Sequence, residues 1–277
     1  MTPESLISSP LLTGLAITLI HFLWQGALVA LVLKALLSLI SYQKSQLRYA
    51  LSSAAMLANL LLPVMTFFLI YDIEYRQTAS LVHALPLLDQ NLYLEQIQTH
   101  AWYLPWLEYL PVLAMVWLVI VFSLAAKLMI ELHHVNKLPQ QGCSPADSAL
   151  QTRFQHLITT IGLTKKVTLL VSHTSHVPMA IGWLKPVVLL PFSMISGLSP
   201  QQLDMLLLHE LAHIRRHDYL VNFFQTLVEI LLFFNPAVAW VSKQMRNERE
   251  YCSDDIAVQH CGDALAYAHT LTDTASL

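Results

Sequence analysis

Three long stretches of the chain are apolar and carry no charge. They are residues 11–33, 49–71 and 109–126. Because a helix rises about 1.5 Å per residue, roughly 20 apolar residues are enough to cross the hydrocarbon core of a bilayer. The pattern therefore predicts three transmembrane helices within residues 1–131, with a lipid bilayer as the surroundings of this half of the chain.

Shorter patterns follow the third span. Two β-branched runs, residues 167–171 and 186–191, are bounded by prolines, which predicts a small, partly irregular sheet with at least one of these strands at an edge. Capping patterns at residues 144–147 and 199–202 predict the starts of two helices. Residues 132–277 are therefore expected to form a domain of helices and a small sheet.

Composition supports a membrane protein and limits its partners. Hydrophobic residues make up 55% of the chain and charged residues only 12%, against roughly 25% charged residues in an average soluble domain. With a net charge of −3 and no basic stripe, we expect no nucleic-acid partner. Cys143, Cys252 and Cys261 are odd in number, and we expect them to be free thiols.

The distribution of Lys and Arg predicts the orientation in the inner membrane. Cytoplasmic loops keep an excess of both residue types near the ends of the spans. Lys34, Lys44 and Arg48 flank the first connection, whereas the second connection carries five acidic residues against the single Arg76. We therefore expect the N-terminus outside and residues 132–277 facing the cytoplasm.

The segment His209-Glu210-Leu211-Ala212-His213 carries the candidate chemistry. Histidines four residues apart lie one helical turn apart, so both imidazoles can bind one tetrahedral zinc ion from the same face. Glu210 then points at the fourth position, where zinc lowers the pKa of a bound water to about 7 and a carboxylate can take its proton. The spacing predicts a zinc site with Glu210 as the base; two histidines on a solvated face are the alternative.

A catalytic zinc ion needs a third protein ligand and an open fourth position. Glu250 is the best candidate, because Asp254, one turn further along, can accept a hydrogen bond from the free ring nitrogen of a ligand histidine. Glu248 lacks such a partner and is the second candidate. We otherwise expect a solvated charged face formed by Lys243, Arg246, Glu248 and Arg249, in which one arginine could also steady a carboxylate.

Residues 219–240 resemble a fourth span, because they are apolar apart from four polar residues. A single crossing would put Glu250 on the opposite side of the membrane from His209, although both must contact one ion. We therefore predict a helical hairpin that bends near residues 235–236 and dips into the bilayer or packs along its surface. Glu229 within it is expected to make a polar contact in the hairpin rather than to bind metal.

The sequence leaves four points open. If four protein ligands complete the coordination of the zinc ion, the domain is a signalling scaffold and not an enzyme. His21 and Gln25 in the first span fit either a transport pathway or contacts between helices. Tyr251, His217 and Arg249 are all candidates for stabilising an oxyanion. Whether the chain forms a homo-oligomer is also open.

The segments HELAHIRRHDYLVN, FFNPAVAW and RNEREYCSDD resemble the BlaR/MecR-type membrane metallopeptidases, the transducers of antibiotic-sensing systems. HFLWQGALVA in the first span and PMAIGWLKPVVLLP before the metal helix extend the resemblance over most of the chain. It implies a gluzincin-like zinc peptidase domain with His209, His213 and Glu250 as ligands and Glu210 as the catalytic base. It also implies cleavage of the chain itself or of a cytoplasmic regulator such as a transcriptional repressor.

The sequence also differs from those transducers. They carry an outer penicillin-binding sensor domain beyond a further span, whereas this sequence ends at Leu277 with neither, so we expect a fragment or a relative that reads another signal. The R-E-Y-x-x-D segment is also similar to membrane proteases that process prenylated or damaged membrane proteins, but those usually have glycine where Ala212 stands and rank second. The expected fold is a mainly α membrane protein with three N-terminal transmembrane helices followed by an α+β peptidase domain.

Overall fold

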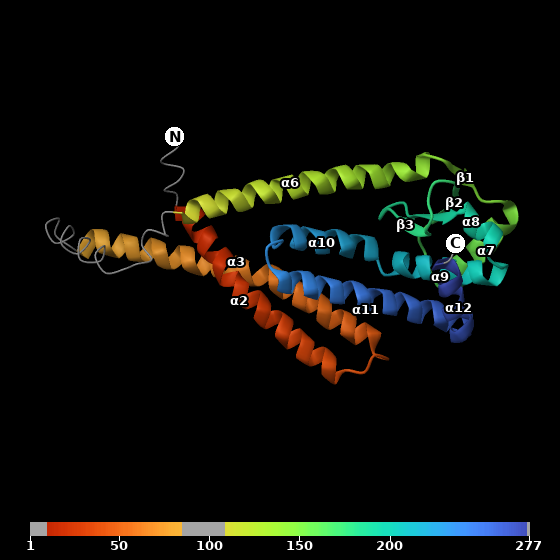
Figure 1. Cartoon of the computed structure of the whole chain (residues 1–277), viewed down its shortest axis with the longest axis horizontal. Coiled ribbons are helices and arrows are strands. Elements are labelled where there is room, and N and C mark those ends of the chain that lie inside the picture. The colour runs from red at the N-terminus through yellow and green to blue at the C-terminus, as the bar shows by residue number, and fades with distance from the viewer. Residues whose placement is uncertain (1–9, 85–108, 276–277) are drawn as a thin grey trace.

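The computed structural model describes residues 10–84 and 109–275 and is mainly helical (Figure 1). Each of the first three helices is long and apolar enough to cross a membrane. The chain is therefore an integral membrane protein of the mainly α class, as predicted. Much of the acidic connection used to predict orientation, residues 85–108, lies outside the described residues. The three helices are α2 (Pro10–Leu39), α3 (Ser45–Ala84) and α6 (Leu110–Lys137).

The three long helices leave most of their apolar surface free for lipid. In the most apolar part of each helix, only 28%, 11% and 6% of the residues are buried inside the protein. The polar residues of α2 make local contacts: Gln25 Nε2 donates to Thr66 Oγ1 of α3 at 3.0 Å, and Trp24 Nε1 donates to His21 Nδ1 at 3.4 Å. These contacts favour packing over a transport pathway.

Helices α10 (Asp218–Leu231) and α11 (Pro236–Cys261) form a hairpin, and α11 packs beside α3 (Figure 1). Asn235 caps the start of α11 by accepting a hydrogen bond from the Ala237 amide at 3.0 Å. Its side chain also donates to the Phe22 carbonyl at 3.0 Å, near the middle of α2. The turn therefore reaches into the layer of the transmembrane helices, which agrees with the predicted membrane-associated hairpin.

Polar side chains hold the two arms of the hairpin together. Glu229 of α10 accepts hydrogen bonds from Ser242 and Arg246 of α11, the latter at 2.6 Å. Gln225 donates to the Ser242 carbonyl at 3.0 Å. Glu229 is thus a contact within the hairpin, as expected, and its charge is paired with that of Arg246.

The second half of the chain adds a small sheet with helices at the end of the molecule away from the hairpin turn (Figure 1). The strand order is β1-β2-β4-β3, with β2 and β4 parallel and both outer strands antiparallel to their neighbours. The elements are η1 (Leu138–Gln140), β1 (Cys143–Pro145), α7 (Ser148–Thr160), β2 (Thr168–Ser172), β3 (Met179–Ile181), β4 (Val187–Pro191), α8 (Phe192–Gly197), α9 (Pro200–Arg215) and α12 (Ala264–Ala275).

Both predicted strands are present as β2 and β4, but the prediction that one of them forms an edge was wrong. They pair with each other in the centre, and the short β1 and β3 form the edges. The prolines do not interrupt the pairing. Pro186 precedes β4, and its carbonyl accepts a hydrogen bond from the Thr168 amide at 3.1 Å, while Pro191 is the last residue of the strand. The edge strand β3, which was not predicted, contacts α9.

One of the two predicted helix starts is shifted. Asp147, expected in the first turn, is itself the N-cap of α7 and accepts a backbone hydrogen bond at 2.9 Å, whereas Ser144 and Pro145 belong to β1. Serine and aspartate are both good caps, so the pattern fitted two positions, and pairing of β1 with β2 selects the later one. The other start is as predicted, with Ser199 and Gln202 in a capping box before α9.

An apolar core beside the sheet fixes the orientation of α9. Leu207 and Leu211 of α9 are fully buried with Phe154 of α7 and with Val188 and Leu190 of β4. Burial of a side chain of this size contributes about 1.5–3 kcal/mol. Because this face of α9 is held in the core, another face of the helix is left to contact α11.

Gly26 of α2 tests the contact between the hairpin turn and the membrane helices. A Cβ at this position would meet the buried Asn235 amide group, whereas a Cβ at Gly14 of the same helix finds its nearest atom at 3.8 Å. We expect Gly26→Ala to displace Asn235 from the Phe22 carbonyl and to lower the free energy of unfolding by about 1–3 kcal/mol relative to Gly14→Ala. Helix propensity cancels in this comparison. Thermal unfolding in detergent measures the difference, and equal midpoints would contradict it.

Candidate metal centre

Two histidines of α9 form one side of the candidate site. His209 and His213 are one turn apart, and their Nε2 atoms lie 3.1 Å from each other. Their side chains are 16% and 18% exposed, so they are largely screened from solvent. The two rings therefore present nitrogen atoms to one shared point, as the four-residue spacing requires.

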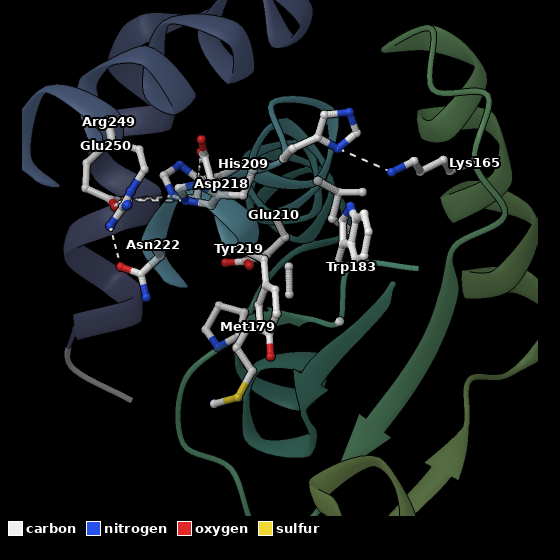
Figure 2. A pocket seen from close by; sticks show the side chains of 16 residues that line it. Lys165, Met179, Trp183, His209, Glu210, Asp218, Tyr219, Asn222, Arg249 and Glu250 are labelled. Carbon is white, nitrogen blue, oxygen red and sulfur yellow. Dashed lines mark hydrogen bonds and ion pairs between the residues drawn. The ribbon is translucent and has the colours of Figure 1, made fainter. Parts of the chain in front are cut away.

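Helix α11 brings Glu250 to the two histidines (Figure 2). Its Oε2 lies 3.6 Å from His209 Nε2 and 3.4 Å from His213 Nε2. The three ligand atoms lie within 4.8 Å of one another, close enough to hold one ion. The second candidate, Glu248, is fully buried and lies 2.7 Å from Arg48 instead. The geometry therefore favours Glu250 as the third ligand.

Each histidine has a carboxylate behind its ring. His213 Nδ1 lies 2.8 Å from Asp218 Oδ2, and His209 Nδ1 lies 3.0 Å from Asp254 Oδ1. The Tyr267 hydroxyl donates to Asp254 at 2.7 Å and lies 2.9 Å from His209 Nδ1. A carboxylate at Nδ1 keeps the proton on that nitrogen and leaves the Nε2 lone pair facing the cluster. Both rings are thus oriented to bind a metal through Nε2.

Two of these partners, Asp218 and Tyr267, were not predicted from the sequence. Asp218 begins α10 directly after His217, whose positive φ of 58° turns the chain after α9. The sequence does place an acidic residue five positions after His213, but the conformation of the turn at His217 decides whether its side chain points to the histidines. Tyr267 comes from α12, and no spacing relates it to the motif.

Glu210 lies in the wall of a cavity beside the histidines and is 8% exposed. Burial raises the pKa of its carboxyl group, while His209, His213 and a hydrogen bond from the Ala180 backbone of β3 oppose the rise. The net shift is upward. A carboxyl group with a raised pKa is a better proton acceptor near neutral pH than an exposed one.

Protons and a metal ion compete for the two imidazole rings. Burial lowers the pKa of His209, but hydrogen bonds to Asp254 and Glu250 outweigh it and raise the pKa to about 10. Burial likewise lowers the pKa of His213, but hydrogen bonds to Asp218 and Glu250 raise it to about 9. Burial raises the pKa of Glu250, yet the two histidines hold it well below its usual range. A divalent ion that displaces both ring protons leaves the net charge of the site unchanged.

Two charged residues near Glu250 are not on the solvated face that we expected. Glu248 is 0% exposed and Arg249 is 7% exposed. Arg249 donates to Gln225 and Asn222 of α10, both at 3.2 Å, and its Nε lies 3.9 Å from Glu250 Oε1. The prediction was wrong for Glu248 and Arg249, because it considered the charges of α11 alone, whereas α3 and α10 cover this side of the helix. Lys243 is exposed and the side chain of Arg246 is 43% exposed, as expected. Arg249 is an arginine that steadies a carboxylate.

The cavity has a volume of about 330 Å³ and lies between the edge strand β3 and the residues that follow α9 (Figure 2). His217 and Arg249, two candidates for stabilising an oxyanion, line it, and so does Tyr219, which was not predicted. The third candidate, Tyr251, is not among the lining residues. The cavity therefore combines the metal cluster with several hydrogen-bond donors and space for part of a peptide.

The donor set fits a divalent metal such as zinc. Two imidazoles and one carboxylate, with one position left for water or substrate, are the ligands of a common type of catalytic zinc site. The three cysteines are free thiols, as expected, and none belongs to the cluster. Together with three helices able to span a membrane, the cluster and its cavity are features typical of membrane metallopeptidases.

The chain belongs to the BlaR1 peptidase family M56, whose model matches residues 12–276. Over 77 residues it is 39% identical to the regulatory protein BlaR1 of Bacillus licheniformis, and over 90 residues it is 28% identical to the methicillin resistance mecR1 protein of Staphylococcus aureus. These segments cover 28% and 32% of this chain but only 13% and 15% of the two relatives. The resemblance to BlaR/MecR-type peptidases is thus confirmed at the level of the family.

Among solved structures, the crystal structure of S. mikatae Ste24p was matched over 96% of this chain and 91% of that chain. The sequence identity is 13% and the TM-score is 0.37. A similarity at this level supports no inference about fold or function.

Metal binding is expected to weaken steeply as the pH falls. Nearby carboxylates raise the pKa of His209 to about 10 and that of His213 to about 9 against the effect of burial, so a proton competes with a metal ion for the Nε2 atoms near pH 7. Because the two Nε2 atoms are within hydrogen-bond distance, they hold at least one proton between them, and its release predicts that the apparent affinity for zinc falls at least about tenfold for each unit of pH decrease between about pH 8 and pH 6. Competition with a chelator of known pH dependence measures the slope. An affinity independent of pH would contradict the protonated pair.

Proposed function

We propose that the chain is a zinc-dependent endopeptidase that cuts a protein segment near the inner face of the membrane. The observation that carries the proposal is the convergence of His209, His213 and Glu250 from two helices beside a cavity that Glu210 also lines. The site thus joins a metal-binding cluster, a buried carboxyl group and room for a substrate. Membership of a peptidase family supports this activity.

In this proposal His209, His213 and Glu250 hold the zinc ion, and Asp254 and Asp218 orient the two rings. A bound zinc ion supplies Lewis acidity and lowers the pKa of water in the open position to about 7. The carboxylates at Nδ1 also increase the basicity of the imidazoles, which strengthens their binding to a cation.

Glu210 is the proposed general base. It is adjacent to His209 and faces the same cavity, and its raised pKa suits a group that takes a proton from water and returns it to the leaving amine. His217 and Tyr219 line this cavity and carry donors suited to the developing oxyanion. Arg249 is less suited, because side chains of α10 already accept its hydrogen bonds.

The substrate is proposed to bind as an extended strand along β3. This strand is an edge of the sheet, and residues from Pro178 to Trp183 contribute to the wall of the cavity. An extended peptide adds to such an edge through backbone hydrogen bonds. This mode of binding would align a peptide bond with the metal cluster and with Glu210.

The proposed substrate is the chain itself or a cytoplasmic or membrane-proximal regulator, such as a transcriptional repressor. The excess of Lys and Arg beside the first connection supports a cytoplasmic position of residues 132–277. The name of the Bacillus licheniformis relative, a regulatory protein, supports a role in signal transduction.

A signalling scaffold with a structural zinc ion is the alternative function. A structural zinc site is normally closed by four protein ligands. In the part of the chain that the structure describes, three such side chains converge, and the cluster opens on a cavity. These features favour catalysis over a structural role.

Glu210→Gln tests the proposed activity. The substitution keeps the size of the side chain but removes the proton acceptor, so we expect zinc content to stay equal and cleavage to fall by about 10²–10⁴-fold. The fragments that accumulate in native membranes are compared between this variant and the wild-type chain.

Glu131→Gln on α6 is the control, because its side chain is 59% exposed and distant in sequence from the motif. It is expected to give the wild-type fragments. Fragments that disappear only with Glu210→Gln would identify the substrate, whereas identical fragments in all three proteins would refute the peptidase proposal.

A further inference from the structure

Arg48 of α3 connects the transmembrane helices to α11 through a buried ion pair. Its Nη2 lies 2.7 Å from Glu248 Oε1, and its Nε lies 3.0 Å from both carboxylate oxygens. The two side chains are 3% and 0% exposed. The remaining nitrogen, Nη1, donates to the carbonyls of Leu37 and Ile40 at the end of α2, at 2.7 and 3.0 Å. One side chain therefore joins α2, α3 and α11.

This ion pair is next to the metal centre along α11. Glu248 contacts α3, whereas Glu250, two residues later, contacts the histidines of α9. Asp255, which follows Asp254, accepts a hydrogen bond from Ser45, the first residue of α3. Helix α3 thus holds α11 at both ends of the segment that carries Glu250 and Asp254.

Tyr49, the residue after Arg48 on α3, contacts the part of the metal centre that carries the histidines through Arg216. The guanidinium carbon of Arg216 lies 4.6 Å from the centre of the Tyr49 ring. Arg216 Nε lies 3.5 Å from one oxygen of Asp218, and the other oxygen of Asp218 lies 2.8 Å from His213 Nδ1. A continuous chain of contacts therefore runs from Tyr49 to His213.

We propose that Arg48 and Tyr49 are positioning residues that set the geometry between the two halves of the metal centre. Arg48 acts on the α11 half through Glu248, and Tyr49 acts on the α9 half through Arg216. This inference rests on the proposed function, because it requires a metal ion between α9 and α11.

Stability alone does not explain the Arg48–Glu248 pair. Removing two charges from water costs about as much as their attraction returns, and apolar side chains of similar volume often stabilise a protein equally well. A bidentate arginine contact adds a defined geometry. Because the same guanidinium also binds two carbonyls of α2, it fixes α11 relative to both membrane helices.

The arrangement gives the membrane helices a route to the metal centre. Arg48 and Tyr49 lie in the first turns of a helix able to span a membrane over Ser45–Asp72. A tilt or rotation of α3 that moves Arg48 and Tyr49 by different amounts would move α11 relative to α9 and so change the distance between Glu250 and the histidines. Signals received in the membrane would then regulate the site without unfolding the domain.

Arg48→Met combined with Glu248→Leu removes the pair without leaving a buried charge unpaired. Arg246→Met combined with Glu229→Leu is the matched control, since it removes an Arg–Glu pair of α11 that contacts α10 instead of α3. The full chain in detergent is assayed for zinc affinity by chelator competition and for the thermal unfolding of the zinc-free protein. We expect the first variant to lose about tenfold in zinc affinity with an unchanged unfolding midpoint, and the control to keep the wild-type affinity.

Wild-type zinc affinity in the first variant, or an equal loss in both variants, would overturn the inference for Arg48. If the first variant does not fold, Arg48→Lys decides, because it keeps the charge but loses the bidentate geometry; wild-type affinity in it would also overturn the inference.

Tyr49→Leu is expected to weaken zinc binding in the same assay, whereas Tyr49→Phe keeps the ring and should retain wild-type affinity. Equal affinities in these two variants would exclude Tyr49 from the positioning role. A wild-type chain that binds no zinc would instead refute the proposed function, so the two failures are distinguishable.

Discussion

The turn between α10 and α11 is the constraint on which the metal centre depends. His213 and Glu250 are separated by an apolar stretch long enough to cross the membrane, and a straight crossing would separate them. Asn235 caps a new helix, and Pro236 at its first position needs no amide partner. The chain therefore reverses beside α2, and α11 returns to α9, where Glu250 meets the histidines.

Local patterns predicted those parts of the molecule that depend on neighbouring residues. Apolar runs predicted three long membrane helices, and the four-residue spacing predicted that His209 and His213 share one face of a capped helix. Burial that depends on distant segments was not predictable in this way. Glu248 was assigned to a solvated face because its partner, Arg48, is 200 residues away in sequence. Tyr267 was missed because only the packing of α12 brings it to His209.

The membrane helices and the candidate site form one physical unit. Helix α11 packs against α3 on one side and α9 on the other, so the helix that carries Glu250 is held by a membrane-spanning segment. Without Arg48, Glu248 would be a buried carboxylate without a charged partner, which is costly. In the proposed function, the geometry of the site would therefore depend on the arrangement of the helices in the bilayer.

X-ray absorption at the zinc edge of the purified full chain tests the metal centre most directly. We predict four light-atom ligands at about 2.0–2.2 Å, two of them imidazoles, one a carboxylate oxygen and one a water oxygen. A spectrum with this pattern would agree with one site formed by the two histidines of α9 and Glu250 of α11 with an open position. A sulfur ligand at about 2.3 Å, or a spectrum without imidazole scattering, would contradict it.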